Sequence, residues 1–163
     1  MTDWIWSIIA VVMVAFAFVV LFGPPYLPTR RRYSKTALDL LALEPGQTML
    51  ELGSGDGRVL LAAAKRGWNV VGIELNPLLV LFSKIYTWRY RRQVHIIWGD
   101  YFKVKWPPVE GIFTFMLPRL MSKLDHHVTA WPHRPVKLAS FAFKIPNKKP
   151  SAKRNGVFLY TYK

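Results

Sequence analysis

The chain has 163 residues, enough for one compact domain and a short appendage but not for a second large catalytic domain. Lys and Arg total 23 against 9 for Asp and Glu, and the net charge of +14 predicts attraction to phosphate-rich surfaces such as anionic lipid or nucleic acid. Because the sequence contains no cysteine, it excludes disulfides, Cys-ligated zinc and a cysteine nucleophile.

The first predicted element is an uncharged apolar helix over residues 4–22. At 1.5 Å per residue this helix would span about 28 Å, which matches the hydrocarbon core of a bilayer. Trp4 and Trp6 would lie at one membrane interface and Tyr26 near the other, and the Gly-Pro-Pro sequence at 23–25 would end the helix. We therefore expect a transmembrane helix here.

The residues on either side of this helix favour an uncleaved membrane helix over a cleaved signal peptide. A cleaved signal peptide would carry basic residues before the apolar run, whereas Asp3 precedes it. Arg30, Arg31 and Arg32 follow the run, so the positive-inside rule predicts a single-pass membrane protein with the rest of the chain on the cytoplasmic side, or on the matrix side in a mitochondrion. The expected division is a transmembrane helix at 4–22, a basic juxtamembrane linker at 23–35 that contacts the bilayer, and a folded domain at 36–163.

Beyond the basic segment, helix and strand patterns alternate. Ser34 is a candidate N-cap for a helix through Leu43. The segments that follow are predicted as strands at 48–52, 68–74 and 93–98, with helices at 58–66 and at 77–90, the second capped by Asn76. This order predicts parallel β-α-β units with right-handed crossovers, and hence a layered α/β sheet.

The C-terminal part shows a weaker pattern. We expect strands at 111–117, 136–143 and 157–162 and a helix at 119–128. The Lys-rich segment 144–155 is predicted as a solvated loop.

The sharpest signal is the loop Glu-Leu-Gly-Ser-Gly-Asp-Gly at 51–57, between a strand and a helix. Its glycines let the backbone turn tightly and approach a ligand, and the following helix presents free N–H groups. A dinucleotide-binding loop, G-x-G-x-x-G, would need glycine where Arg58 stands, so the spacing favours S-adenosylmethionine over NAD. The candidate cofactor-binding residues of this loop are Glu51, Gly53, Ser54, Gly55, Asp56 and Gly57.

Two further acids follow the second and third predicted strands. Glu74 is placed to accept hydrogen bonds from both ribose hydroxyls of the cofactor, and Asp100 from the adenine amino group, while a neighbouring aromatic or apolar side chain covers the ring. The alternatives are an ordinary solvated acid at 74 and an ordinary Gly-Asp turn at 99–100. Ligands of α/β sheets bind beyond the carboxyl ends of the strands, so acids at successive strand ends indicate that Glu74 and Asp100 belong to the same cofactor site. The neighbouring residues Leu75, Asn76 and Tyr101 are also assigned to this cofactor site.

Other polar groups have simpler interpretations. His126 and His127 are adjacent and point about 100° apart on a helix, so no metal site is expected. Arg89, Arg91 and Arg92, with Lys103 and Lys105, could form a nucleic-acid patch, but no RNA-binding signature accompanies them. Anionic lipid is the simpler partner for these residues, and nucleic acid is not expected.

Several segments resemble a known family. They are Glu51–Arg58, Ala63–Gly67, Gly72–Pro77 and Trp88–Arg89. They are similar to the membrane-anchored class I (seven-β-strand) protein-lysine methyltransferases that act on the ATP synthase c-subunit and adenine nucleotide translocase. The resemblance implies a Rossmann-like class I methyltransferase sheet with flanking helices, here preceded by the transmembrane helix.

The resemblance also implies roles for particular residues. Gly53, Gly55 and Glu74 would bind S-adenosylmethionine, Asp100 would contact its adenine, and the segment Leu117-Pro118 would lie beside the target amine. Many methyltransferases of amino groups have an Asn-Pro-Pro-Tyr-like motif after the fourth strand, which this sequence lacks. No residue is therefore assigned as the catalytic base.

The leading hypothesis is a protein-lysine N-methyltransferase, with its S-adenosylmethionine-dependent domain at 36–163, that acts on a membrane protein. An anchor would raise the effective concentration of such a target. One alternative keeps the cofactor but uses a lipid or small hydrophobic acceptor, and another is a non-enzymatic basic module that binds the membrane surface.

Overall fold

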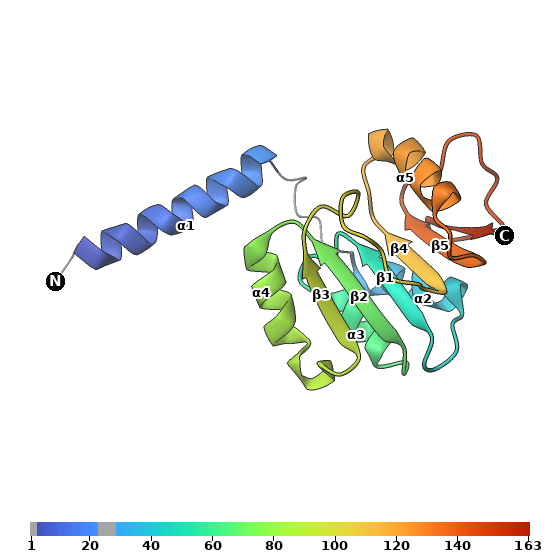
Figure 1. Ribbon diagram of the computed structural model, residues 1–163, viewed down its shortest axis with the longest axis horizontal. Coiled ribbons are helices and arrows are strands. Elements are labelled where there is room, and N and C mark those ends of the chain that lie inside the picture. Colours follow the sequence, from blue (N-terminus) through green and yellow to red (C-terminus); the bar gives the residue numbers. More distant parts are fainter. Residues whose placement is uncertain (1–2, 23–28) are drawn as a thin grey trace.

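The structure, a computed structural model, describes residues 3–22 and 29–163 (Figure 1). The helices are α1 (Asp3–Phe22), α2 (Arg31–Leu41), α3 (Arg58–Ala64), α4 (Pro77–Tyr86) and α5 (Pro118–Ala130), with a short 3-10 helix, η1 (Trp88–Tyr90). The strands are β1 (Thr48–Leu52), β2 (Asn69–Glu74), β3 (Val94–Trp98), β4 (Gly111–Thr114), β5 (Val136–Phe141), β6 (Ala152–Arg154) and β7 (Val157–Tyr162).

The N-terminal helix forms where the sequence predicts it, but it does not support a membrane span. α1 lies outside the layers of the domain (Figure 1), and its residues 4–11, 13 and 14 are exposed. Among residues 3–22 and 29–163, no helix combines the length and the apolar character that crossing a bilayer requires. The expectation of a single-pass membrane protein with a cytoplasmic catalytic domain is therefore wrong. The proposed helix stop and Tyr26 lie outside the described residues, as do residues 23–28 of the predicted linker.

The sheet has the strand order β3-β2-β1-β4-β5-β7-β6. All neighbours from β3 to β5 are parallel, which confirms the predicted β-α-β units, whereas β7 runs antiparallel to both β5 and β6. Asn155 and Gly156 join β6 to β7 with φ angles of 48° and 75°, the left-handed pair that a two-residue hairpin requires. The prediction of a loop throughout 144–155 was wrong because residues 152–154 form β6.

Apolar side chains divide between the two faces of the sheet. Leu50 and Leu52 of β1 belong to one buried cluster together with α5, and Met49 belongs to a second cluster together with α2 and α3. This division follows from the alternation of side chains along a strand, and burial on both faces is typical of parallel sheets. The layers of a Rossmann-like fold are visible in Figure 1, with helices on both faces of the sheet.

α2 begins four residues earlier than predicted. Arg30 is its N-cap residue, and the Ser34 hydroxyl donates to the Arg31 carbonyl at 3.1 Å from within the helix, so the predicted Ser34 cap was wrong. The helix lies against β5 and β7, far along the chain. Its apolar side therefore covers the C-terminal part of the sheet.

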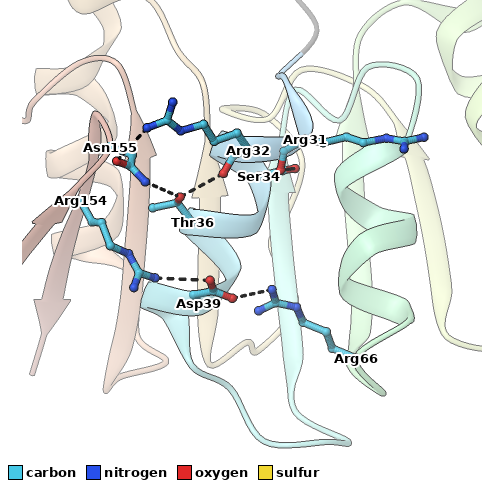
Figure 2. A network of polar contacts seen from close by, with 8 residues as sticks. All are labelled: Arg31, Arg32, Ser34, Thr36, Asp39, Arg66, Arg154 and Asn155. Atoms are coloured by element: carbon cyan, nitrogen blue, oxygen red, sulfur yellow. Dashed lines mark hydrogen bonds and ion pairs between the residues drawn. The ribbon is translucent and has the colours of Figure 1, made fainter.

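Polar contacts hold α2 on this surface (Figure 2). The Arg32 guanidinium donates to the Asn155 side-chain oxygen at 3.4 Å. Asp39 forms ion pairs with Arg66, at 2.6 Å, and with Arg154, at 3.4 Å. Because these side chains are partly exposed, each pair stabilises the fold by no more than about 1 kcal/mol.

Candidate active site

The carboxyl ends of four strands meet at one edge of the sheet. Leu52, the last residue of β1, pairs with Ile73 of β2 and with Thr114, the last residue of β4. Glu74, the last residue of β2, pairs with Trp98, the last residue of β3. The loops after these strands carry most of the predicted site residues and are therefore neighbours.

The glycine-rich loop folds back over the end of β2. Gly53, Gly55 and Gly57 have φ angles of 81°, 54° and 79°, a region that disfavours residues with a side chain. The N–H groups of Gly53 and Ser54 both donate to the Ile73 carbonyl, at 2.9 and 3.1 Å. A Cβ atom at Gly53 would meet nothing within 4 Å, so this side of the loop is open to a ligand.

Gly57 has a packing role as well. A Cβ atom there would lie 2.2 Å from the Ser83 hydroxyl oxygen, which belongs to α4. Glycine at this position therefore allows α4 to pack closely against the start of α3.

Glu74 joins two of the loops. Its carboxylate accepts the Gly55 N–H at 2.8 Å through one oxygen and the Asn76 N–H at 2.9 Å through the other. The side chain is buried, which excludes the alternative of an ordinary solvated acid. Each carboxylate oxygen retains a second lone pair that can accept a further hydrogen bond.

The residues after Glu74 start α4. The Asn76 side-chain oxygen accepts the N–H groups of Leu78 and Leu79, at 3.0 and 3.4 Å, and Pro77 occupies the first helical position, as predicted. Leu75 is exposed, and its carbonyl accepts the indole N–H of Trp98 at 2.9 Å. Asn76 thus has a helix-capping role next to the Glu74 carboxylate.

The other two acids of the first loop lie in different surroundings. Asp56 forms an ion pair with Arg58 at 2.6 Å and also accepts the Arg58 N–H. Glu51 is buried, and one of its carboxylate oxygens has no hydrogen-bond partner among the described residues. Burial, and then the charges of Asp56 and Glu74, raise the pKa of Glu51 well above its usual value, while a hydrogen bond from the Leu60 backbone opposes them.

The loop after β3 is folded tightly. Asp100 accepts the Phe102 N–H at 2.9 Å, which is a turn interaction, and the Trp106 indole donates to the Tyr101 carbonyl at 2.6 Å. Burial, followed by the charges of Asp100 and Glu74, raises the pKa of the Tyr101 hydroxyl. Tyr101 therefore lies within electrostatic reach of both predicted cofactor-binding acids.

Sequence reasoning did not identify the contact between this loop and α5. The His127 ring lies 4.4 Å from the Trp106 ring and 5.9 Å from the Phe102 ring, and the Lys123 ammonium lies 4.2 Å from the Phe102 ring. Burial, and then Lys123, lower the pKa of His127. In the sequence, only the aromatic residues that follow Asp100 indicated that this loop packs against another element.

The predicted substrate-proximal pair starts α5. Leu117 is its half-buried N-cap residue and Pro118 its exposed first residue, shortly after the end of β4. Within residues 29–163, no hydrogen bond joins either residue to the Glu74 carboxylate. Across the described part of the chain, no three His, Asp or Glu side chains gather closely enough to hold a metal ion.

Comparison with known proteins gives related lysine methyltransferases. The chain is 32% identical over 128 residues to the ATP synthase c-subunit lysine N-methyltransferase of Xenopus laevis, covering 77% of this chain and 56% of that protein. It is 31% identical over 131 residues to adenine nucleotide translocase lysine N-methyltransferase of Mus musculus, covering 78% of this chain and 57% of that protein. The chain thus spans a little over half the length of these relatives.

A solved structure shows the same fold. The RNA methyltransferase of Salinibacter ruber, crystallised with S-adenosyl-L-homocysteine, has a TM-score of 0.77 and 25% identity over 83% of this chain and 93% of that one. This similarity confirms the Rossmann-like class I methyltransferase fold. The family model for the ANTKMT methyltransferase domain matches residues 51–152, from the glycine-rich loop to the start of β6. The chain belongs to the ANTKMT methyltransferase domain family.

Proposed function

We propose that this chain is an S-adenosylmethionine-dependent methyltransferase that modifies a lysine of a membrane protein. The observation that carries the proposal is the buried Glu74 carboxylate, which accepts N–H groups from Gly55 and Asn76. An acid fixed at the end of β2 beside a glycine loop is suited to a ribose diol. The relatives named above are lysine methyltransferases for the ATP synthase c-subunit and adenine nucleotide translocase.

The residues at this edge fit the cofactor chemically. The open side of Gly53 leaves room for a ligand, and the free lone pairs of Glu74 match two hydroxyl donors. Asp100 would accept from the adenine amino group, with Tyr101 beside the ring. The proposed cofactor-binding set comprises Glu51, Gly53, Ser54, Gly55, Asp56, Gly57, Glu74, Leu75, Asn76, Asp100 and Tyr101.

When bound, S-adenosylmethionine would supply a methyl group carried by a positively charged sulfur. The carboxylates of Glu74 and Asp100 would give this edge of a basic protein a local negative charge, which attracts a cation. A lysine amine, with an ordinary pKa of about 10.4, must be neutral to act as a nucleophile. We propose that Leu117 and Pro118 line its approach, because an apolar surface favours the neutral amine.

The cofactor site is tested by calorimetric titration of S-adenosylmethionine into the full chain and two variants. Glu74→Gln removes the charge of the buried acceptor and should weaken binding by about 10-fold to 100-fold, since hydrogen bonds to charged groups contribute about 1.5–3 kcal/mol. Glu44→Gln removes an exposed carboxylate outside the site and should bind as the parent does. A folded parent that binds no cofactor would refute the proposal.

The acceptor is tested by methyl transfer from tritiated S-adenosylmethionine in a membrane extract. The proposal predicts label in protein, recovered as methylated lysine after hydrolysis. Label found in the organic extract would favour the lipid or small hydrophobic acceptor. Label found in RNA would retain methyl transfer but refute the lysine acceptor.

A further inference from the structure

One surface of the domain is unusually apolar. Within residues 29–163, every large hydrophobic side chain that is exposed belongs to α4 or the segments beside it. We call this surface the α4 face, and it consists of Leu75, Leu78, Leu81, Phe82, Ile85, Tyr86, Trp88 and Trp98. Soluble surfaces normally scatter such residues singly, so their concentration on one helix indicates an interaction surface.

The α4 face follows from helical spacing. Leu78, Leu81, Phe82 and Ile85 recur every three or four residues and form one stripe, while Val80 and Ser83 point into the domain. Residues of an amphipathic helix that packs on a sheet are normally polar on the outer side. Here the outer side is apolar, so packing within the domain does not account for the sequence of α4.

The aromatic residues of the α4 face are held in defined positions although they are exposed. Trp98 is 67% exposed, but its indole N–H donates to the Leu75 carbonyl at 2.9 Å. The rings of Phe82 and Tyr86 stack with centroids 6.2 Å apart. These contacts present the aromatic side chains outward as an ordered surface.

Positive charge surrounds the α4 face. Lys84, Arg89, Arg91 and Arg92 are all exposed, and the sequence contains no acid between Glu74 and Asp100. The Arg91 guanidinium lies 4.8 Å from the Trp88 ring, and no ion pair in the described part of the chain neutralises any of the four. Apolar and aromatic residues bordered by Lys and Arg are typical of helices that lie in the interface of an anionic membrane.

We propose that the α4 face docks on an anionic lipid bilayer, with α4 lying in the headgroup region and the basic residues contacting lipid phosphates. A second copy of the chain is a poor occupant, because pairing two such faces would bring their positive charges together. An anionic bilayer provides an apolar interior for the hydrophobic side chains and negatively charged phosphates for the basic ones. This docking is peripheral and needs no membrane-spanning helix.

The α4 face lies directly beside the candidate site. The surface begins at Leu75, directly after Glu74, and Asn76 both contacts the Glu74 carboxylate and caps α4. Docking would therefore hold the carboxyl edge of the sheet close to the headgroups. An acceptor group that projects from a membrane protein near the lipid surface would meet the site there.

The test uses the absence of native cysteine. An environment-sensitive fluorophore is attached to the full chain at Ile85→Cys, on the α4 face, or at Thr161→Cys, an exposed position on β7 across the sheet. Vesicles of equal parts phosphatidylglycerol and phosphatidylcholine are then added, with pure phosphatidylcholine as the uncharged comparison. We expect a blue shift at position 85 with anionic vesicles only, and none at position 161.

A second variant tests the role of charge. Replacing Arg89, Arg91 and Arg92 together with Gln should weaken vesicle binding by roughly fivefold per residue, because each basic residue near an anionic surface contributes about that factor. Vesicle binding that leaves the label at position 85 unchanged would overturn the proposal, since another part of the chain would then make the contact. A blue shift that grows with protein concentration without lipid would show self-association and would also overturn it.

Discussion

At the scale of single residues, the unusual group is the buried Glu51 carboxyl near the end of β1. It is buried, and Asp56 and Glu74 are the charged groups that act on it most strongly. Burial, followed by these two charges, raises its pKa, so the folded chain holds a proton that the unfolded chain releases near pH 4.3. The stabilisation from this proton is complete below the unfolded pKa and is lost as the pH rises through the folded pKa.

Glu51→Gln should therefore remove a pH dependence of stability. Gln cannot ionise, so above the folded pKa of Glu51 the variant should gain free energy of unfolding relative to the parent. Urea denaturation of both proteins from about pH 5 to about pH 9 measures this difference. Parallel stability curves over that range would contradict a raised Glu51 pKa.

Gly57→Ala should destabilise the fold by about 2–4 kcal/mol, because it adds a steric clash to backbone strain. The new Cβ atom would lie 2.2 Å from the Ser83 hydroxyl oxygen. Gly46→Ala is the matched control, since its φ of 88° is similar but its Cβ atom would meet nothing within 4 Å. It should cost only about 1 kcal/mol.

Ser83→Ala offers a second check on the clash. Combined with Gly57→Ala it removes the clashing oxygen, so it should restore part of the lost stability. A double-mutant cycle by thermal denaturation measures this coupling. If the two substitutions changed the free energy of unfolding additively, contact with Ser83 would not be the reason that position 57 requires glycine.

The sequence predicted several site residues but not their interactions. The glycine spacing and the acids at strand ends identified Gly55, Glu74 and Asp100, because these features depend on local pattern. That Glu74 joins two loops, or that Asp56 is engaged by Arg58, depends on side-chain directions that spacing does not determine. Their roles in cofactor binding remain predictions.

At the scale of elements, α4 depends on its cap. Asn76→Ala removes the acceptor for the Leu78 and Leu79 N–H groups and should lower the free energy of unfolding by about 1 kcal/mol. Asn76→Ser keeps a capping oxygen and should retain most of the stability. Chemical denaturation of the two variants measures the difference, and equal losses would argue against a capping role.

Element boundaries show where sequence patterns are informative. The alternation through β1, α3, β2, α4 and β3 is strongly periodic, and the structure confirms it. Ser34 was misassigned because a serine that bonds a carbonyl within a helix has the same sequence appearance as a cap. β6 is short and carries two basic residues, as edge strands often do, and only the Asn155-Gly156 pair marked its hairpin.

At the scale of the whole molecule, Asn155 connects the two ends of the domain. Its side chain accepts from Arg32 and donates to the Thr36 hydroxyl, at 3.4 and 3.3 Å (Figure 2). Asn155→Gly keeps the left-handed turn but removes both contacts, and should cost about 1 kcal/mol. Hydrogen exchange should show faster opening of α2 in this variant, and unchanged α2 protection would contradict the connection.

The packing of α2 on β5 and β7 also has a consequence for synthesis. The contacts between α2 and Asn155 join residues 119 and 123 positions apart, and the part of α2 that packs on β5 and β7 has no partner until these last strands have left the ribosome. At ordinary translation speeds that interval is on the order of ten seconds. During this time the nascent chain carries an amphipathic helix that is only partly covered, so we expect chaperones to bind α2 in the nascent chain.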